Sequence, residues 1–138
     1  MRFSLLSLRD YVRAELVDRE TVEETREFLK ALAAEALRTG RTRVLICVHT
    51  SRPIFKVEAY QASLYLKELA ARPAFKVALV ASRLDIRAAH EYLEVLARQQ
   101  GANVRSFADE SPAVEWLRRP EVFEKNVESA RADFGFKR

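Results

Sequence analysis

A continuous apolar run near the middle of the chain predicts a strand that is buried on both faces. Residues 44–48, VLICV, show no alternation of polar and apolar side chains, and three of the five are β-branched. This pattern is typical of a parallel strand whose sheet has helices on both sides. The run ends at His49, and Pro53 lacks the N–H that strand pairing needs. Because ligands and partners bind such sheets at the carboxyl ends of strands, we expect any functional site there.

The residues before this run predict two short strands and a helix. Segments 2–8 and 11–17 suggest a hairpin, since polar and apolar residues alternate in the second segment. A helix then begins after a cap at Asp18 or at Thr21, and Thr21 opens the sequence TVEE, which has the spacing of a capping box. Gly40 is expected to end this helix, because glycine readily adopts the left-handed conformation found after helices.

The residues after the central run alternate between helix and strand. The predicted elements are a helix over 57–71, a strand over 75–81, a helix that begins around a capping box at 82–85 and ends before Gly101, a strand over 103–107 and a short helix over 113–118. The first of these helices has one apolar face, made of Val57, Tyr60, Leu64 and Leu69. The order predicts a single α/β domain with a mixed, mostly parallel sheet of four or five strands flanked by about four helices.

The end of the chain lies outside this α/β pattern. We assign residues 1–118 to the α/β domain and residues 119–138 to a C-terminal helical extension or tail, which Pro120 would open. The apolar residues of this extension, Phe123, Val127, Phe134 and Phe136, are expected to dock on the domain or on a second copy of the chain. A homo-oligomer is therefore one expected assembly.

Composition and charge narrow the class of protein. The chain has 24 basic and 20 acidic residues, for a net charge of +4, and the basic residues are dispersed without forming a block. Nucleic-acid binding is therefore not expected, although the positive charge keeps it as a third hypothesis. No apolar stretch reaches the ~20 residues of a membrane span, and the N-terminus lacks the pattern of a signal peptide. We expect a cytoplasmic protein with no membrane span.

Two hydroxyl groups follow the central run and belong to the first candidate site. Thr50 and Ser51 would stand near the start of the next helix, whose free N–H groups favour an anion. Arg52 and Lys56 add positive charge at the same place. These four residues are therefore our candidate site for a protein partner, an anion or a phosphoryl group. The alternative interpretation is that Thr50 and Ser51 only end the strand and form a turn.

A second set of polar residues is predicted at the same edge of the sheet. His49, Ser82 and Asp109 lie at or just after the ends of predicted strands, so we expect them on the rim of a pocket. Ser51, His49 and Asp109 could form a catalytic triad, but the sequence has no Gly-x-Ser-x-Gly motif to accompany them. Catalysis is therefore disfavoured.

Metal and thiol chemistry are not expected either. The chain has two histidines, and neither has the three or four closely spaced ligands of a metal site. His90, in the third predicted helix, is expected to be half-buried or to face solvent. Cys47 lies within the central run and is interpreted as a small buried hydrophobic residue. We therefore predict no enzyme, no metal and no cofactor.

The closing part of the α/β pattern resembles the SpoIIAA-like (STAS-type) family, which is related to Sec14-like domains. The resemblance rests on residues 101–110, GANVRSFADE, which run into 113–117, AVEWL, and on the preceding strand KVALV over 76–80. It covers about residues 11–118. The resemblance implies a mixed sheet with helices around it, no cofactor, and a role in regulation or ligand binding.

The same resemblance implies a phosphorylation site after the central strand. The Ser or Thr that partner kinases modify in this family corresponds to Thr50 or Ser51 of this sequence. The chain departs from the family pattern here, because His49 replaces the usual acidic residue and Arg52-Pro53 follow.

Our first functional hypothesis is a non-enzymatic regulatory or protein-interaction domain that acts through the loop and helix after the central strand. The alternative is a domain that binds a small molecule or a lipid-like, apolar or anionic ligand in a pocket between the second helix, the third helix and the sheet.

Overall fold

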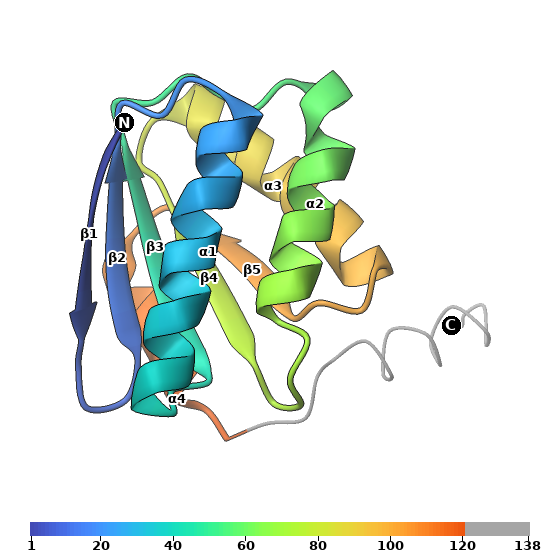
Figure 1. The fold of residues 1–138 in the computed structure, drawn as a ribbon. Helices are drawn as coiled ribbons and strands as arrows, with labels where there is room; N and C mark the ends of the chain where they lie inside the picture. The colour runs from blue at the N-terminus through green and yellow to red at the C-terminus, as the bar shows by residue number, and fades with distance from the viewer. Residues whose placement is uncertain (121–138) are drawn as a thin grey trace.

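A five-stranded mixed sheet organises the protein, and a computed structural model of the chain describes it over residues 1–120 (Figure 1). The strands are β1 (Arg2–Ser7), β2 (Val12–Val17), β3 (Arg43–His49), β4 (Lys76–Val80) and β5 (Val104–Phe107), and they lie side by side in this order. β1 runs antiparallel to β2, and the other neighbouring pairs are parallel. The predicted mixed, mostly parallel sheet is confirmed.

The central apolar run forms the middle strand of this sheet. In β3, Val44 pairs with Val12 of β2 on one side and with Val77 of β4 on the other. All five residues of the run 44–48 are buried. The prediction of a strand buried on both faces is therefore confirmed.

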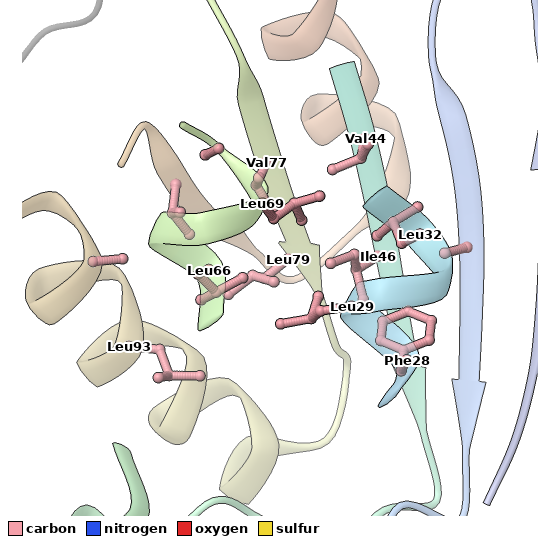
Figure 2. Packing of buried hydrophobic residues seen from close by; sticks show 14 of the residues in the cluster. Phe28, Leu29, Leu32, Val44, Ile46, Leu66, Leu69, Val77, Leu79 and Leu93 are labelled. Atoms are coloured by element: carbon pink, nitrogen blue, oxygen red, sulfur yellow. The ribbon is translucent and has the colours of Figure 1, made fainter. Parts of the chain in front are cut away.

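Four helices cover the two faces of the sheet unequally. They are α1 (Val22–Thr39), α2 (Lys56–Leu69), α3 (Leu84–Gln99) and α4 (Glu110–Arg118). Buried residues of α1, α2 and α3 form one large apolar core with alternate residues of the strands, and Figure 2 shows leucines of these three helices near Ile46 and Leu79 of the sheet. α4 packs on the opposite face against Leu45, Cys47 and Val80. α4 begins three residues earlier than predicted.

Local sequence signals determine both ends of α1. Thr21 Oγ1 accepts a hydrogen bond from the Glu24 N–H at 3.1 Å, and the Glu24 carboxylate accepts one from the Thr21 N–H at 3.2 Å. This reciprocal pair confirms the predicted capping box and selects Thr21, not Asp18, as the cap. Gly40 follows the helix with a φ of 72°, the left-handed conformation that the sequence predicted.

Only part of the apolar face predicted for the second helix packs on the core. Leu69 is buried and Leu64 is half-buried, but the residues near the start of the helix face solvent. Val57 is 90% exposed and Tyr60 is 59% exposed. The other buried residues of α2 are mostly small: Ala59, Ala62, Ser63 and Leu66. Small side chains fit here because α2 packs between α1 and α3, where close approach of the helices leaves little room. The outer apolar residues therefore face solvent.

The capping box predicted at residues 82–85 is wrong. The residue before α3 is Arg83, and no side chain caps the helix from that position. Asp85 instead accepts two hydrogen bonds from the Arg83 guanidinium, at 2.9 and 2.6 Å, and one from the Ile86 N–H at 2.8 Å. A carboxylate inside the first turn thus replaces the cap, which leaves Ser82 exposed.

The C-terminal end of α4 is attached to the sheet by Lys76, a buried residue of β4. Its Nζ donates hydrogen bonds to the Trp116 and Arg119 carbonyl oxygens at 2.8 and 2.9 Å. The ammonium also lies 4.7 Å from the centre of the Trp116 ring. These contacts satisfy carbonyls that a helix end leaves unpaired.

The structure describes only residues 119 and 120 of the predicted C-terminal extension. From residue 121 on, the extension over 119–138 and its apolar residues Phe123, Val127, Phe134 and Phe136 lie outside the described residues. Within residues 1–120, no helix is both long enough and apolar enough to cross a membrane.

Candidate functional site

The loops that follow β2 and β3 are joined at the carboxyl edge of the sheet. The Asp18 N–H donates to the Thr50 carbonyl at 3.1 Å, and the Arg52 N–H donates to the Arg19 carbonyl at 2.9 Å. Between these bonds, Ser51 Oγ accepts from the Arg19 N–H at 3.1 Å and donates to the His49 carbonyl at 2.7 Å. The two loops therefore form one hydrogen-bonded unit.

Of the two predicted hydroxyls, only Thr50 is accessible. Ser51 is buried, and both of its hydrogen bonds hold the loops together. Thr50 is exposed. Neither residue stands at a helix start, because α2 begins at Lys56. The free N–H groups of that helix are therefore separated from both hydroxyls by the loop.

Thr50 has a strained backbone, and relieving it is expected to stabilise the protein. Its φ is +30°, a value that β-branched residues rarely adopt. Such strain costs about 1–3 kcal/mol, whereas glycine costs roughly 0.5–1 kcal/mol in unfolded-chain entropy. We expect Thr50→Gly to raise the free energy of unfolding by about 1 kcal/mol, measured by urea unfolding with Trp116 fluorescence.

A threonine with an ordinary backbone provides the control for this prediction. Thr42 has no positive φ, so Thr42→Gly should lower the free energy of unfolding by about 1 kcal/mol. Equal losses in the two variants would show that the Thr50 backbone stores no strain.

The two predicted cations differ in how far their charges are neutralised. The Arg52 guanidinium donates two hydrogen bonds to the Glu58 carboxylate, at 3.1 and 2.9 Å, and Arg52 Nε donates to the Glu20 carbonyl at 2.5 Å. The bonds from Arg52 lower the pKa of Glu58 and keep it ionised. Lys56 is exposed, and its Nζ lies 5.5 Å from the centre of the Tyr92 ring. Of these two cations, Arg52 has a carboxylate partner, and none is seen for Lys56 among residues 1–120.

His49 lies on the face of the sheet that α4 covers. Its Nε2 is 3.4 Å from Glu15 Oε2, and nearby Arg13 makes a two-bond pair with Glu110 at 2.7 and 2.9 Å. Cys47 points to the same face, 3.9 Å from Glu110. Burial raises the pKa of the Cys47 thiol to about 11, and the Glu110 charge adds to this effect. Cys47 therefore stays protonated near neutral pH and is a poor nucleophile.

The opposite face of the sheet holds a cavity of about 50 Å³. It occupies the space between α2, α3 and the sheet in which the sequence predicted a pocket, and α1 closes it. Its lining residues are Leu16, Arg19, Thr25, Phe28, Leu29, Ile46, Val48, Arg52, Pro53, Ile54, Ala62, Leu66, Leu79, Ile86, Ala89, His90 and Leu93. Arg52, Pro53 and Ile54 are only half-buried, so the cavity approaches the surface at the loop after β3.

The three residues predicted on the pocket rim do not line this cavity. In β3, Val44, Ile46 and Val48 point toward α1, α2 and α3, so the alternating His49 points toward α4. Ser82 and Asp109 are exposed and are also absent from the cavity wall. Of the predicted site residues, the structure brings only Arg52 to the cavity.

The prediction for His90 is wrong, because the structure buries it. The imidazole is 5% exposed, lines the cavity, and its Nδ1 has no hydrogen-bond partner among the described residues. Burial lowers the pKa of His90 to about 4, with a smaller contribution from the Arg19 charge. His90 follows Ile86 by four residues and precedes Leu93 by three. This helical spacing, which places His90 on the buried side of α3, was the signal in the sequence.

Sequence reasoning also missed Arg19 and Thr25. Thr25 precedes Phe28, Leu29 and Leu32 at helical spacing, which would have placed it on the buried side of α1. No comparable signal exists for Arg19, because its burial depends on the joined loops. Among residues 1–120, no three His, Cys, Asp or Glu side chains gather closely enough to hold a metal ion.

Comparison with known proteins bears on the fold. No family model and no curated protein matches the sequence. The structure is similar to the NMR structure of the protein TM1081, with a TM-score of 0.60 and 19% sequence identity, over 86% of this chain and 90% of that one. A weaker likeness, with a TM-score of 0.48 and 14% identity over 85% of this chain and 98% of the other, is to the unphosphorylated anti-sigma factor antagonist SpoIIAA. The α/β fold that the SpoIIAA-like resemblance implied is confirmed for this chain.

Proposed function

We propose that the chain is a non-enzymatic regulatory domain that binds a protein partner through the loop after β3 and the outer face of α2. The outer α2 face is the set of exposed apolar side chains Phe55, Val57 and Tyr60. The observation that carries the proposal is the 90% exposure of Val57 beside a half-exposed tyrosine. Contiguous exposed apolar groups on a soluble domain are typical of interaction sites.

The outer α2 face has the composition and spacing of a helix-mediated contact. Val57 and Tyr60 are three residues apart and share one side of the helix. Burying each such side chain in a partner would contribute about 1.5–3 kcal/mol. Lys56 lies between Phe55 and Val57 and adds an exposed charge that favours an acidic neighbour on the partner.

Regulation through Thr50 belongs to the same proposal. A phosphoryl group on this exposed threonine would add a charge of about −1.5 to −2 to the loop that leads from β3 to α2. Modification of Ser51 would first require the joined loops to open, since its hydroxyl is buried and doubly bonded. The sequence resemblance to the SpoIIAA-like family supports this kind of control.

Photo-crosslinking in the cells that make this chain tests the proposal. A photoreactive residue at position 57 is expected to trap a discrete partner, and Tyr60→Glu should reduce the yield about tenfold, the equivalent of about 1.4 kcal/mol. Thr50→Glu should change the yield as well. The matched control places the photoreactive residue at Leu37, an exposed leucine near the C-terminal end of α1 and outside the outer α2 face. The same products from both positions, or no effect of Tyr60→Glu, would contradict the proposal.

The cavity favours a second function, binding of a small ligand. Its walls are mostly apolar, and at about 50 Å³ it is too small for a long acyl chain. Titration with a small neutral alcohol, 2-methylpropan-1-ol, is expected to shift the NMR signals of amides around the cavity. Unchanged signals at millimolar concentrations of both this alcohol and the matching acid would contradict a ligand function.

A further inference from the structure

We propose that β1 is a dimerisation edge: two copies of the chain pair through antiparallel β1 strands, so that their two sheets become one continuous sheet. The strand spans Arg2–Ser7 and forms one edge of the sheet. Figure 1 shows no helix or strand of residues 1–120 beyond it. This inference goes beyond the functions proposed above, because it concerns neither the outer α2 face nor the cavity.

The hydrogen bonds between β1 and β2 determine which backbone groups of β1 face outward. At the turn between the two strands, the Leu8 N–H donates to the Tyr11 carbonyl at 2.8 Å. Bonded and non-bonded pairs alternate along an antiparallel ladder, so every second residue of β1 counted back from Leu8 also bonds to β2. The backbone N–H and C=O groups that point away from the sheet therefore belong to the other residues of the strand: Phe3, Leu5 and Ser7.

The outer edge of β1 lacks the features that usually stop a sheet edge from pairing. Such edges are normally short, charged, interrupted by proline or a bulge, or covered by another segment. β1 pairs with β2 over six consecutive residues without a bulge, contains no proline, and has Arg2 as its one charged residue. No other strand or loop backbone of residues 1–120 bonds to its outward groups. The edge is therefore open to a further strand.

The opposite edge of the sheet, β5, is blocked by side chains of α3. β4 donates to the Asn103 carbonyl, so the alternate residues Val104 and Ser106 face outward. The Ser106 N–H donates to the Glu94 carboxylate at 2.7 Å, and Arg98 Nε donates to the Val104 carbonyl at 3.0 Å. Outward backbone groups of β5 are thus already bonded, whereas those of β1 are available. This contrast selects β1 as the pairing edge.

A register centred on Leu5 uses all the outward groups of β1. In this register Leu5 lies opposite Leu5 of the second copy, and Phe3 lies opposite Ser7 of that copy. Each of these pairs exchanges both of its N–H···O bonds. A shift of two residues in either direction would pair an outward residue with one outside β1, so the centred register forms the most complete ladder.

The side chains of β1 are self-complementary in this register. Leu6 is 56% exposed and would lie opposite Ser4 and diagonal to Leu6 of the second copy. Phe3 is 40% exposed on the other face of the sheet and would become a diagonal neighbour of Leu5. The two copies of Arg2 would lie at opposite ends of the paired strands, so no like charges meet. A strand that fits this edge needs apolar side chains on both faces, and a second copy of β1 supplies them.

Sedimentation equilibrium of the full chain, at about 10–300 μM, tests the dimer and is expected to show a monomer–dimer equilibrium. Leu6→Glu should raise the Kd of the dimer at least about tenfold, because it removes the apolar contact and places two carboxylates at diagonal positions. Within one chain the new carboxylate would face Arg13 on β2, which favours folding. Leu37→Glu, the same substitution at an exposed leucine of α1, is the matched control and should leave the Kd unchanged.

Disulfide trapping tests the register and remains decisive if Leu6→Glu does not fold. Position 4 of one copy would lie opposite position 6 of the other in a non-hydrogen-bonded pair, where Cα atoms are about 4.5 Å apart and a disulfide can form. Under mild oxidation, a mixture of Ser4→Cys and Leu6→Cys chains should therefore give covalent dimers, and either variant alone should give far fewer. Cys47 is buried and does not compete.

Both experiments can overturn the proposal. A chain that stays monomeric over the whole range of concentration would overturn it, and so would a dimer that Leu6→Glu does not weaken. Absence of covalent dimers from the mixture, or equal yields from the mixture and the single variants, would overturn it as well. A dimer that Leu6→Glu weakens and that the mixture traps would support it.

Discussion

Phe28→Ala is expected to lower the free energy of unfolding by about 3–5 kcal/mol. The ring is almost fully buried and belongs to the large core that joins α1, α2 and α3 to the sheet. It also meets the Phe3 ring edge to face, with 5.3 Å between ring centres. The substitution removes these contacts and leaves an empty volume, because neighbouring backbone segments relax only in part.

Urea unfolding measures this loss, with Trp116 as the fluorescent probe. Trp116 is the single tryptophan of the chain and is a buried residue of α4, on the other face of the sheet. Phe55→Ala removes an exposed phenylalanine and should change the free energy of unfolding by no more than about 0.5 kcal/mol. Similar losses in the two variants would contradict the described core.

Acidification is expected to destabilise the protein through His90. The folded-state pKa of His90 is about 4, whereas an unfolded histidine titrates near its ordinary 6.5. The unfolded chain therefore binds a proton at a higher pH than the folded chain does. Stability is complete above about pH 6.5 and falls as the pH decreases toward 4. Between pH 7 and about pH 4.5, this residue should account for a loss of about 2–3 kcal/mol.

The His90→Phe variant isolates this contribution. It keeps an aromatic ring at the position and removes the titration, so its stability should fall less than that of the unmodified chain over the same range of pH. Carboxylates with lowered pKa values, such as Glu58 and Glu110, add an acid loss common to both proteins. His49→Gln removes the exposed histidine and should leave the steep dependence intact. An identical pH dependence for His90→Phe and the unmodified chain would contradict the burial of His90.

Several elements of the fold followed from local patterns alone. The apolar run 44–48 could be recognised as an inner strand, because any surface exposure of five such residues would be unfavourable. The Thr21 capping box and Gly40 bounded α1, since caps depend on the backbone of adjacent residues. The order of strands and helices then restricted the topology to an α/β sheet with right-handed crossovers.

The candidate sites depended on which side of each element meets its neighbours. α2 has an apolar face with Val57 and Tyr60 and another with small residues, and only packing between α1 and α3 decides that the second is buried. Strand alternation placed His49 opposite its neighbour Val48, but the sequence did not tell which face held the cavity.

The chemistry of the cavity belongs entirely to tertiary structure. Arg19, Thr25 and His90 come from a loop, the first helix and the third helix, and their sequence separations carry no signal that they meet. Short-range patterns predict helix caps, turns and the apolar side of an element, because these depend on residues that are close along the chain. Burial of a charge or an unpaired nitrogen depends instead on distant segments that exclude water together, so only the assembled fold decides it.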